Sequence, residues 1–335
     1  VTGGLGYIGS HTSVLLLEKG YDLVIVDDLS NSNEKVIENI SQITSKVPVF
    51  EKIDLKDKGS VSKLFNNYDF DGIIHFAAHK SVNESVNYPD KYFQNNVGSL
   101  ENIIYEIQKL KKPMNFIFSS SCTVYGQADS MPINEGFELK KAESPYGQSK
   151  RKCEEILENF HKTGHNFKNI TLRYFNPIGA HPTSLIGELP IGIPENLVPY
   201  ITQTAVGKRD HLTVFGNDYD TNDGTCVRDY IHIMDLAEVH ITCLEKLMNI
   251  KDDSFFKVYN VGTGKGTSVL ELINLFENVN QLKLNYKIGK RRDGDVVTAY
   301  ADTSKIKNEL NWSTKYSLES ALKTAWNWEL NINKK

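Results

Sequence analysis

Hydrophobic and polar positions in the first half of the chain follow a repeating pattern of short apolar runs and longer stretches with helical spacing. The apolar runs predict buried strands, and the stretches between them predict helices that cover a sheet. Expected strands cover 22–26, 47–53, 72–76, 114–118 and 170–174, with helices through 14–17, around 61–67, from Asn95 and from Pro145. Strands that alternate with helices are typical of an α/β fold with a doubly wound parallel sheet, which we expect over residues 1–175.

The pattern is less regular after residue 175, and many Gly and Pro residues lie between 176 and 224. This composition favours long loops over regular elements. We therefore expect residues 176–335 to form mainly a smaller C-terminal α/β domain that closes over a substrate. Some segments, such as 225–245, are expected to return to the first domain.

Composition and charge narrow the range of partners. A net charge of -4 over 335 residues gives no electrostatic reason to expect nucleic acid or an anionic membrane. No apolar run reaches the ~18 residues of a membrane span, and no signal-like segment lies near the start. The four cysteines are far apart and lack CxxC spacing, which favours reduced thiols in a cytoplasmic protein and no metal site. Because the sequence begins at Val1, we expect a few residues of a first strand to precede it.

A glycine-rich stretch opens the chain, with Gly3, Gly6 and Gly9 spaced as GxxGxxG before a helix. Glycine permits a tight turn and lets the backbone approach a pyrophosphate, which binds the free amides of the helix start. The next strand ends in Asp27 and Asp28, the first of them 18 residues after Gly9. A carboxylate there can bind ribose hydroxyls and repels a 2′-phosphate, so the pattern favours NAD over NADP. A glycine-rich turn with two solvated aspartates is the alternative.

Polar and small residues follow the ends of later strands, at the edge where such sheets bind ligands. Asp54 and Leu55 follow one strand, the small residues of 77–80 follow the next, and Ser119–Thr123 follow a third. Small residues let a cofactor lie close to the backbone, and a serine hydroxyl can orient a substrate. Serines that only form a turn are the alternative.

The stretch 144–150 carries the strongest candidate for acid/base chemistry. Ser144 suits the N-cap and Pro145 the first position of a helix, which places Tyr146 and Lys150 one turn apart on one face. The ammonium group and the positive helix end favour the phenolate. The pair is therefore expected to exchange a proton with a substrate hydroxyl. Taken alone, a Tyr and a Lys at this spacing are common on ordinary helices.

The linked motifs resemble a known superfamily. They are TGGxGYIGSH, DDLSNS, HFAAxK, FSSSCTVYG and SPYGQSK, then LRYFNPIGAHP at 172–182, GIPENLVPY at 192–200, FGNDYDTNDGTCVRDYIH at 215–232 and RRDGD at 291–295. Their order is similar to that of the extended short-chain dehydrogenase/reductase superfamily. Within its NAD(P)-dependent epimerase/dehydratase family, the chain resembles the UDP-glucose 4-epimerases over nearly its whole length.

The resemblance implies a Rossmann-type NAD domain, a UDP-sugar substrate and a homodimer formed through two helices of the NAD domain. It implies an isomerase of galactose metabolism that interconverts UDP-galactose and UDP-glucose through a 4-keto intermediate, with tightly bound NAD and with Tyr146, Lys150 and Ser121 as catalytic residues. The residues implied for NAD are Gly3, Gly6, Tyr7, Ile8, Gly9, Asp27, Asp28, Leu29, Ser30, Asn31, Ser32, Asp54, Leu55, Phe76, Ala77, Ala78, Lys80, Asn95, Ser121, Tyr146, Lys150, Tyr174 and Phe175. Those implied for the UDP-sugar are Lys80, Ser121, Thr123, Tyr146, Asn176, Asn196, Leu197, Thr213, Val214, Phe215, Arg228, Arg292, Asp295 and Ala299.

Alternatives within and outside the superfamily make different demands on the sequence. Related 4,6-dehydratases generally carry an Asp-Glu pair after the active-site Thr, whereas Thr123 is followed by Val124 and Tyr125. A non-enzymatic NAD-binding regulator on the same fold typically lacks the Tyr/Lys pair, which this chain retains. Ala299 aligns where some relatives have a tyrosine, so we expect UDP-GlcNAc and UDP-GalNAc as possible further substrates, unless the neighbouring Tyr300 fills the same space.

The glycines at 262–266 suggest a second phosphate-binding loop. Their spacing does not match GxxxxGK[ST], and they follow a short expected strand. A turn that leads into a helix around 268–276 explains them without a ligand.

Overall fold

The computed structural model describes residues 1–292 and 295–334, and its largest element is a parallel β-sheet. Its strands are β1 (Val24–Asp27), β2 (Val49–Lys52), β3 (Gly72–His75), β4 (Met114–Ser121), β5 (Phe167–Tyr174) and β10 (Phe255–Val261). Thr2 bridges Val26 and His75, so the order across the sheet is β2, β1, Thr2, β3, β4, β5 and β10.

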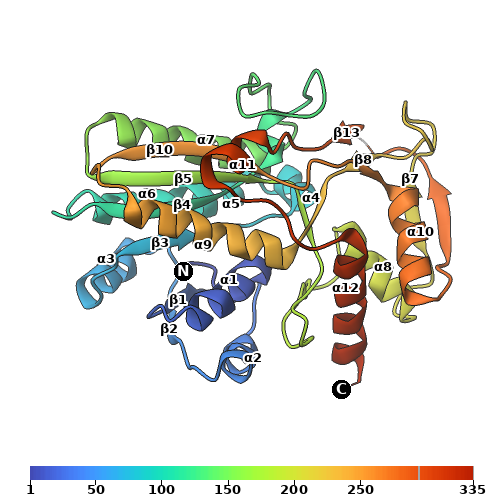
Figure 1. Cartoon of the computed structure of the whole chain (residues 1–335), viewed down its shortest axis with the longest axis horizontal. Coiled ribbons are helices and arrows are strands. Elements are labelled where there is room, and N and C mark those ends of the chain that lie inside the picture. The colour runs from blue at the N-terminus through green and yellow to red at the C-terminus, as the bar shows by residue number, and fades with distance from the viewer. Residues whose placement is uncertain (293–294, 335) are drawn as a thin grey trace.

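Helices cover both faces of this sheet. On one face lie α1 (Tyr7–Glu18), α9 (Ile233–Asn249) and α11 (Ser304–Leu310); on the other lie α3 (Lys58–Asn67), α6 (Gly98–Ile107) and α7 (Pro145–Lys162) (Figure 1). Neighbouring strand residues serve opposite faces, because Ile74 packs in the core with α1 and α9 whereas Ile73 packs with α3 and α6. The predicted doubly wound parallel sheet is confirmed.

Shorter elements connect the layers of this first half. They are α2 (Lys35–Thr44), α4 (Val82–Asn87), α5 (Pro89–Tyr92), the π-helix η1 (Phe93–Val97) and the 3-10 turn η2 (Cys122–Tyr125). The expectation that a helix opens at Asn95 is wrong, because Pro89 occupies the first position of a helical run that continues through η1 into α6. Asn95 therefore lies inside that run.

The second half contains three small sheets and three further helices. The strand pairs are β6 (Asn176–Ile178) with β9 (Tyr230–His232), β7 (Leu212–Phe215) with β12 (Tyr286–Gly289), and β8 (Val227–Arg228) with both β11 (Thr267–Ser268) and β13 (Thr298–Ala299). Helices α8 (Leu197–Ala205), α10 (Val269–Asn280) and α12 (Leu318–Asn333) enclose a separate core around Ile201, Ile273 and Leu322. Figure 1 shows these three helices together at one end of the molecule, away from α3 and β2.

The polypeptide crosses between the two regions more than once. After β6 it forms α8 and β7, then returns to the large sheet with α9 and β10, and adds α11 before ending in α12. The end of β5 and the start of β6 are separated only by Phe175, so the carboxyl edge of the large sheet faces the second region.

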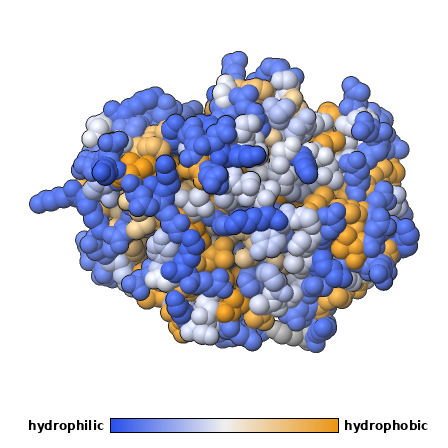
Figure 2. Space-filling model, in the orientation of Figure 1, coloured by the Kyte–Doolittle hydropathy of each residue, from blue (hydrophilic) through white to orange (hydrophobic). Residues whose placement is uncertain are grey.

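Among the described residues, no helix combines the length and the apolar character needed to cross a membrane. On the face drawn in Figure 2, hydrophilic residues predominate and hydrophobic residues form scattered patches.

Candidate active site

The carboxyl end of β4 and the start of α7 bring the predicted catalytic residues to one place. The Ser144 hydroxyl accepts a hydrogen bond from Gly147 N at 3.2 Å, and Pro145 follows as the first residue of α7, as predicted. At the end of β4, the Ser121 hydroxyl accepts hydrogen bonds from the amide and hydroxyl of Thr123, at 3.2 and 3.0 Å. Only 9 % of Ser121 is exposed, so its hydroxyl is fixed in a largely dry site.

Tyr146 lies at the first turn of α7, within reach of Ser121. Burial raises the pKa of Tyr146 to about 12, and a hydrogen bond with Ser121 partly offsets this rise. The Tyr146 ring also packs edge to face on Tyr92, with 6.5 Å between ring centroids. The structure thus fixes both the position of the phenol and its contact with the serine.

Lys150 follows one turn later and is 3 % exposed. Its Nζ donates to the carbonyl oxygen of Ser119 at 2.7 Å, and burial lowers its pKa to about 8. The expectation that Lys150 depresses the Tyr146 pKa is wrong for this arrangement, because desolvation is the larger effect at Tyr146 and the ammonium group is directed at a carbonyl.

Two buried charged residues that the sequence analysis missed hold this arrangement. Glu154, one further turn along α7, accepts from Arg173 Nε at 3.0 Å and from Arg173 Nη2 at 2.6 Å. The Ser120 hydroxyl donates to the same carboxylate at 2.5 Å. This network ties α7 to β4 and β5, next to Ser121 and Lys150.

Asn96 is a third residue that the sequence analysis missed. Its side chain donates to His79 O and to Ser149 Oγ, both at 3.0 Å, and accepts from His79 N at 2.8 Å. It therefore connects the loop after β3 with α7. The predicted Asn95 donates to the Asn96 side chain at 3.1 Å.

The glycine-rich turn lies at the same edge of the sheet. Gly3 has a φ of +64°, and a Cβ there would lie 2.7 Å from the backbone nitrogen of Ala77. A Cβ at Gly9 would lie 2.2 Å from the Gly3 oxygen. Gly6 is the N-cap of α1 and offers no side-chain bond to the first amides of the helix, which include those of Tyr7 and Ile8.

The loop after β1 is organised by its two aspartates. Asp27 accepts from Leu5 N at 3.1 Å, from Leu29 N at 3.0 Å and from Ser32 Oγ at 2.7 Å. Asp28 accepts from the amide and hydroxyl of Ser30, and Asn31 completes this loop. Asp27 thus joins the glycine-rich turn to the loop 28–32.

The remaining residues implied for NAD differ in their accessibility. Phe76 packs on His240 with 4.7 Å between ring centroids, and the Tyr174 hydroxyl bonds to the same imidazole. Asp54 is exposed and accepts from Lys56 N, whereas Leu55 is 5 % exposed within the core beside α3 and α6, so only its backbone can face a ligand. Ala77, Ala78 and Phe175 also lie at the carboxyl edge, where Phe175 is buried.

Lys80 lies in the loop after β3 and forms an ion pair with Glu188, with 3.0 Å between Nζ and Oε1. The same Glu188 oxygen accepts from Asn196 Nδ2 at 2.7 Å. Glu188 therefore joins two residues that the resemblance implies for ligand binding, across the boundary between the two regions. Sequence analysis gave no sign of this residue.

The residues implied for the sugar nucleotide line the second region. Arg228 donates to the Val227 carbonyl at 2.9 Å and lies close enough to lower the pKa of Cys122, although burial raises that pKa overall to about 11. Asn176 donates its backbone amide to Asp229 O at 2.9 Å. Arg228 therefore lies near Cys122, the residue after Ser121.

The exposed part of this region contains Phe215 and Arg292. Arg292 pairs with Asp295 at 2.6 Å and stacks over the ring of Phe215, which is 45 % exposed. Residues 293–294 of the RRDGD motif lie outside the described residues. Along β7 the side chains alternate, so Thr213 and Phe215 face away from the core whereas Val214 is buried in it and can offer only its backbone. Leu197 packs against the same core.

Ala299 lies in β13 and is 8 % exposed, beside Val124 and Phe175. The next residue, Tyr300, projects from the opposite face of the strand toward Gly266, whose Cβ would lie 3.2 Å from the tyrosine ring. Tyr300 therefore does not fill the space at Ala299.

The glycines at 262–264 wrap an internal carboxylate. Asp229 is fully buried and accepts from Thr263 N at 2.8 Å, Thr263 Oγ1 at 2.6 Å and Gly264 N at 3.0 Å. A Cβ at Gly262 would lie 2.4 Å from this carboxylate. The predicted turn without a ligand is consistent with this contact, because the loop amides are occupied by Asp229.

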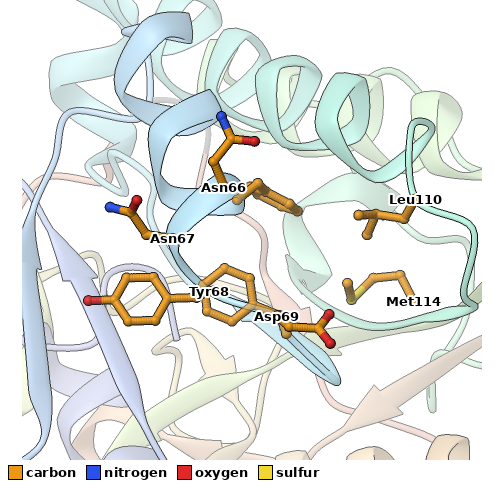
Figure 3. A pocket seen from close by; sticks show the side chains of 8 residues that line it. Asn66, Asn67, Tyr68, Asp69, Leu110 and Met114 are labelled. Carbon is orange, nitrogen blue, oxygen red and sulfur yellow. The ribbon is translucent and has the colours of Figure 1, made fainter.

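A separate pocket lies at the opposite edge of the sheet. It has a volume of about 260 Å³ and is lined by residues 65–70, Leu110 and Met114. Figure 3 shows Leu110 and Met114 on one side of it and Asn66 and Asn67 on the other. Met114 begins β4 and Ser121 ends it, which separates the pocket from the catalytic residues by roughly 20 Å.

Comparisons with known proteins agree with this geometry. A family model described as GDP-mannose 4,6 dehydratase matches residues 1–325. UDP-glucose 4-epimerases from Pasteurella multocida and Bacillus subtilis are 47 % and 46 % identical to this chain, covering 98 % and 99 % of it and 96 % and 97 % of their own lengths.

Solved structures show the same similarity in three dimensions. The UDP-glucose 4-epimerase of Stenotrophomonas maltophila, with bound NAD and formylated UDP-arabinopyranose, has a TM-score of 0.95 at 42 % identity and covers 99 % of this chain and 98 % of its own. That of Bifidobacterium longum, in complex with NAD+ and UDP, has a TM-score of 0.93 at 41 % identity with the same coverage. Since similarity in sequence and in fold extends over both regions, the chain belongs to the UDP-glucose 4-epimerase family.

Proposed function

We propose that the protein interconverts UDP-galactose and UDP-glucose by inverting C4, with tightly bound NAD. The observation that carries this proposal is that Ser121, Tyr146 and Lys150 lie together at the end of β4. The glycine-rich turn lies at the same edge of the sheet. Relatives described as UDP-glucose 4-epimerases include proteins that are 44 % and 47 % identical to the chain. The enzyme is an isomerase, and the reaction needs no second substrate because it is redox-neutral.

The residues at the carboxyl edge fit a dinucleotide. Gly3 and Gly9 keep the turn free of side chains at the start of α1, whose first amides lack a side-chain cap. Asp27 presents a fixed carboxylate to ribose hydroxyls and disfavours a 2′-phosphate, which supports NAD over NADP. When bound, NAD accepts a hydride from C4 of the sugar and returns it to C4.

Tyr146 moves the proton in this scheme. Its phenolate oxygen takes the proton of the C4 hydroxyl as the C4–H bond breaks, and returns the proton when the 4-keto group is reduced. Ser121 donates a hydrogen bond to the reacting oxygen. Lys150, whose pKa of about 8 leaves its ammonium group mostly charged at neutral pH, binds the nicotinamide ribose. Inversion follows if the keto sugar turns its other face toward the nicotinamide.

Cationic and aromatic residues of the second region are proposed to bind UDP. Guanidinium groups bind phosphates bidentately, so Arg228 and Arg292 are assigned to the diphosphate. Phe215 is exposed beside Arg292 and offers a ring on which a base can stack. The other proposed contacts are those of Lys80, Thr123, Asn176, Asn196, Leu197, Thr213, Val214 and Asp295, with Leu197 and Val214 acting through their backbone.

Acetylated sugars are proposed as additional substrates. Ala299 is small and Tyr300 faces away from it, so neither side chain occupies the position proposed for an N-acetyl group. A structural neighbour from Campylobacter jejuni, 36 % identical to this chain, is described as a UDP-Glc/GlcNAc 4-epimerase.

A dehydratase of the same superfamily is the second candidate, because the matching family model carries that name. Elimination of water from a 4-keto sugar needs an acid and a base beside C5 and C6. The residues after Thr123 are the fully buried Val124 and Tyr125, and the Tyr125 hydroxyl donates to Asn260 Oδ1 at 2.7 Å. This chemistry therefore disfavours a dehydratase, and the retained Tyr/Lys pair disfavours a non-enzymatic NAD-binding regulator.

We also propose a cytoplasmic homodimer. Four apolar side chains on and between α4 and η1 are 36–62 % exposed, namely Val82, Val86, Tyr88 and Phe93. A second copy of the chain that packs its NAD domain on this surface would bury them. Four free cysteines fit a reducing compartment.

For the domains, we propose that residues 1–175 form the NAD domain and 176–335 mainly the UDP-sugar domain, with α9 and β10 added to the large sheet.

Incubation of the purified full-length protein with UDP-galactose, without added nucleotide, tests the proposal. Chromatography should show a mixture of UDP-galactose and UDP-glucose, and acid extraction should release NAD from the protein. Formation of a 4-keto-6-deoxy product would instead support the dehydratase. No conversion of either UDP-hexose, even with added NAD, would contradict the proposed function.

A further inference from the structure

The segment 179–188 forms a closed loop between the two regions. Ala180 and Gly187 form an antiparallel bridge, and inside it His181 N donates to Ile186 O at 3.1 Å while Ser184 N donates to His181 O at 2.8 Å. In Figure 1 this loop is the yellow-green segment drawn between α2 and α12. Its own hydrogen bonds give it a defined shape.

One side of the loop is fixed to α12. Trp328 Nε1 donates to Glu188 O at 2.9 Å, and Asn331 Nδ2 donates to Ser184 O at 2.7 Å. Gly187 permits this approach, because a Cβ there would lie 2.5 Å from the Trp328 ring. These contacts therefore hold the loop against α12 of the second region.

The other side of the loop packs against the nucleotide-binding half. Ile186 is 2 % exposed and completes a hydrophobic cluster with Leu5, Val14, Leu17, Ile25 and Ile40. Leu5 belongs to the glycine-rich turn itself, and Asn39 Nδ2 of α2 donates to Leu185 O at 2.8 Å. A residue from the second half of the chain thus lies in the core that supports the turn.

Both ends of the loop contact residues that we assign to NAD. The Tyr7 hydroxyl donates to Gly179 O at 2.6 Å, and Lys80 pairs with Glu188 at 3.0 Å. The loop therefore spans the carboxyl edge of the sheet from the start of α1 to the segment after β3. A dinucleotide that lies along this edge has the loop beside it over that whole distance.

We infer that the loop 179–188 retains the bound dinucleotide and that Ile186 is its anchor, an inference that rests on the proposed function. A reaction that returns the same hydride needs a cofactor that stays bound from the oxidation of C4 until the 4-keto group is reduced. Release requires the loop to separate from α1 and α2, which exposes Ile186. The Lys80–Glu188 pair contributes less, because the Lys80 side chain is 50 % exposed and its charge is screened by solvent.

Exchange of bound NAD for deuterium-labelled NAD, followed by mass spectrometry of the extracted nucleotide, measures the retention directly. Ile186→Ala should exchange about tenfold faster than the wild type or more, since the loss of a buried Ile side chain costs at least that factor. Ile186→Val removes one carbon and should lie between the two. The matched control is Ile273→Ala, because Ile273 is also fully buried but lies in α10, in the core of the second region.

The possible outcomes distinguish a failure of the proposed role of the loop from a failure of the NAD assignment. Wild-type protein that carries no NAD and does not acquire it would overturn both proposals. Wild-type protein that carries NAD while Ile186→Ala and Ile186→Val exchange it at the wild-type rate would overturn the role of the loop alone. Equal acceleration by Ile273→Ala would also overturn it, because the effect would then follow from lost stability. Glu188→Gln should accelerate exchange less than Ile186→Ala.

Discussion

Replacement of Glu154 by Gln is expected to cost the protein much of its stability. Glu154 and Arg173 are 8 % and 6 % exposed and share three hydrogen bonds, and the same carboxylate accepts from Ser120. Gln keeps the shape but leaves the guanidinium charge buried without a partner. Removal of one member of such a pair costs about 3–5 kcal/mol, a large part of the ~5–15 kcal/mol of a typical domain.

Urea unfolding at pH 7, followed by circular dichroism, measures this loss. Glu155→Gln is the matched control, because Glu155 is the next residue of α7 but is 51 % exposed and should cost no more than about 0.5 kcal/mol. Combining Glu154→Leu with Arg173→Met removes both charges and should recover most of the stability. A loss below about 1 kcal/mol for Glu154→Gln, or a double variant as unstable as the single one, would refute the reasoning.

The same substitution should act on Lys150. The Glu154 carboxylate opposes the effect of burial and raises the pKa of Lys150. Its removal should lower that pKa below about 8 and shift the alkaline limb of turnover to lower pH. Glu155→Gln should leave the pH profile unchanged, which separates this electrostatic effect from a general loss of stability.

Three further predictions concern the site. Tyr146→Phe should lower turnover by about 10³-fold while the protein still folds and binds UDP-sugar, and activity within about tenfold of wild type would contradict the assigned role. Ala299→Tyr should abolish turnover of UDP-GlcNAc and UDP-GalNAc and spare UDP-galactose; an equal effect on both classes of substrate would be against it. Burial lowers the pKa of Lys150 from 10.5 to about 8. Between these two pH values the amine is protonated in the unfolded chain but largely neutral in the folded protein. The contribution of Lys150 to stability should therefore rise by about 3 kcal/mol from pH 8 to 10.5, and the free energy of unfolding of the wild type relative to Lys150→Met should increase by this amount over that range.

The features predicted correctly from the sequence depend on short stretches of chain. The parallel sheet follows from the spacing of apolar runs, and the start of α7 follows from Ser144 and Pro145. The expected strands 22–26 and 114–118 end one residue before Asp27 and three residues before Ser121, where β1 and β4 end.

The features that the sequence did not predict depend on contacts between distant segments. Glu188 meets Lys80 across 108 residues of chain, and Arg173 of β5 reaches Glu154 of α7. The direction of the Tyr146 pKa was wrong because burial is set by the whole fold, whereas the sequence showed only a lysine one turn away. The side chain of Leu55 lies in the core and leaves only its backbone to contact a ligand, because neighbouring residues at a strand end face different ways.

The most direct test of the central claim follows the hydrogen at C4. UDP-galactose that carries deuterium at C4 is incubated with the purified protein in ordinary water, and the product is examined by proton NMR. The account predicts UDP-glucose in which deuterium remains at C4, because the hydride is returned to the carbon that it left. Loss of the label to solvent, or no conversion with NAD present, would contradict the account.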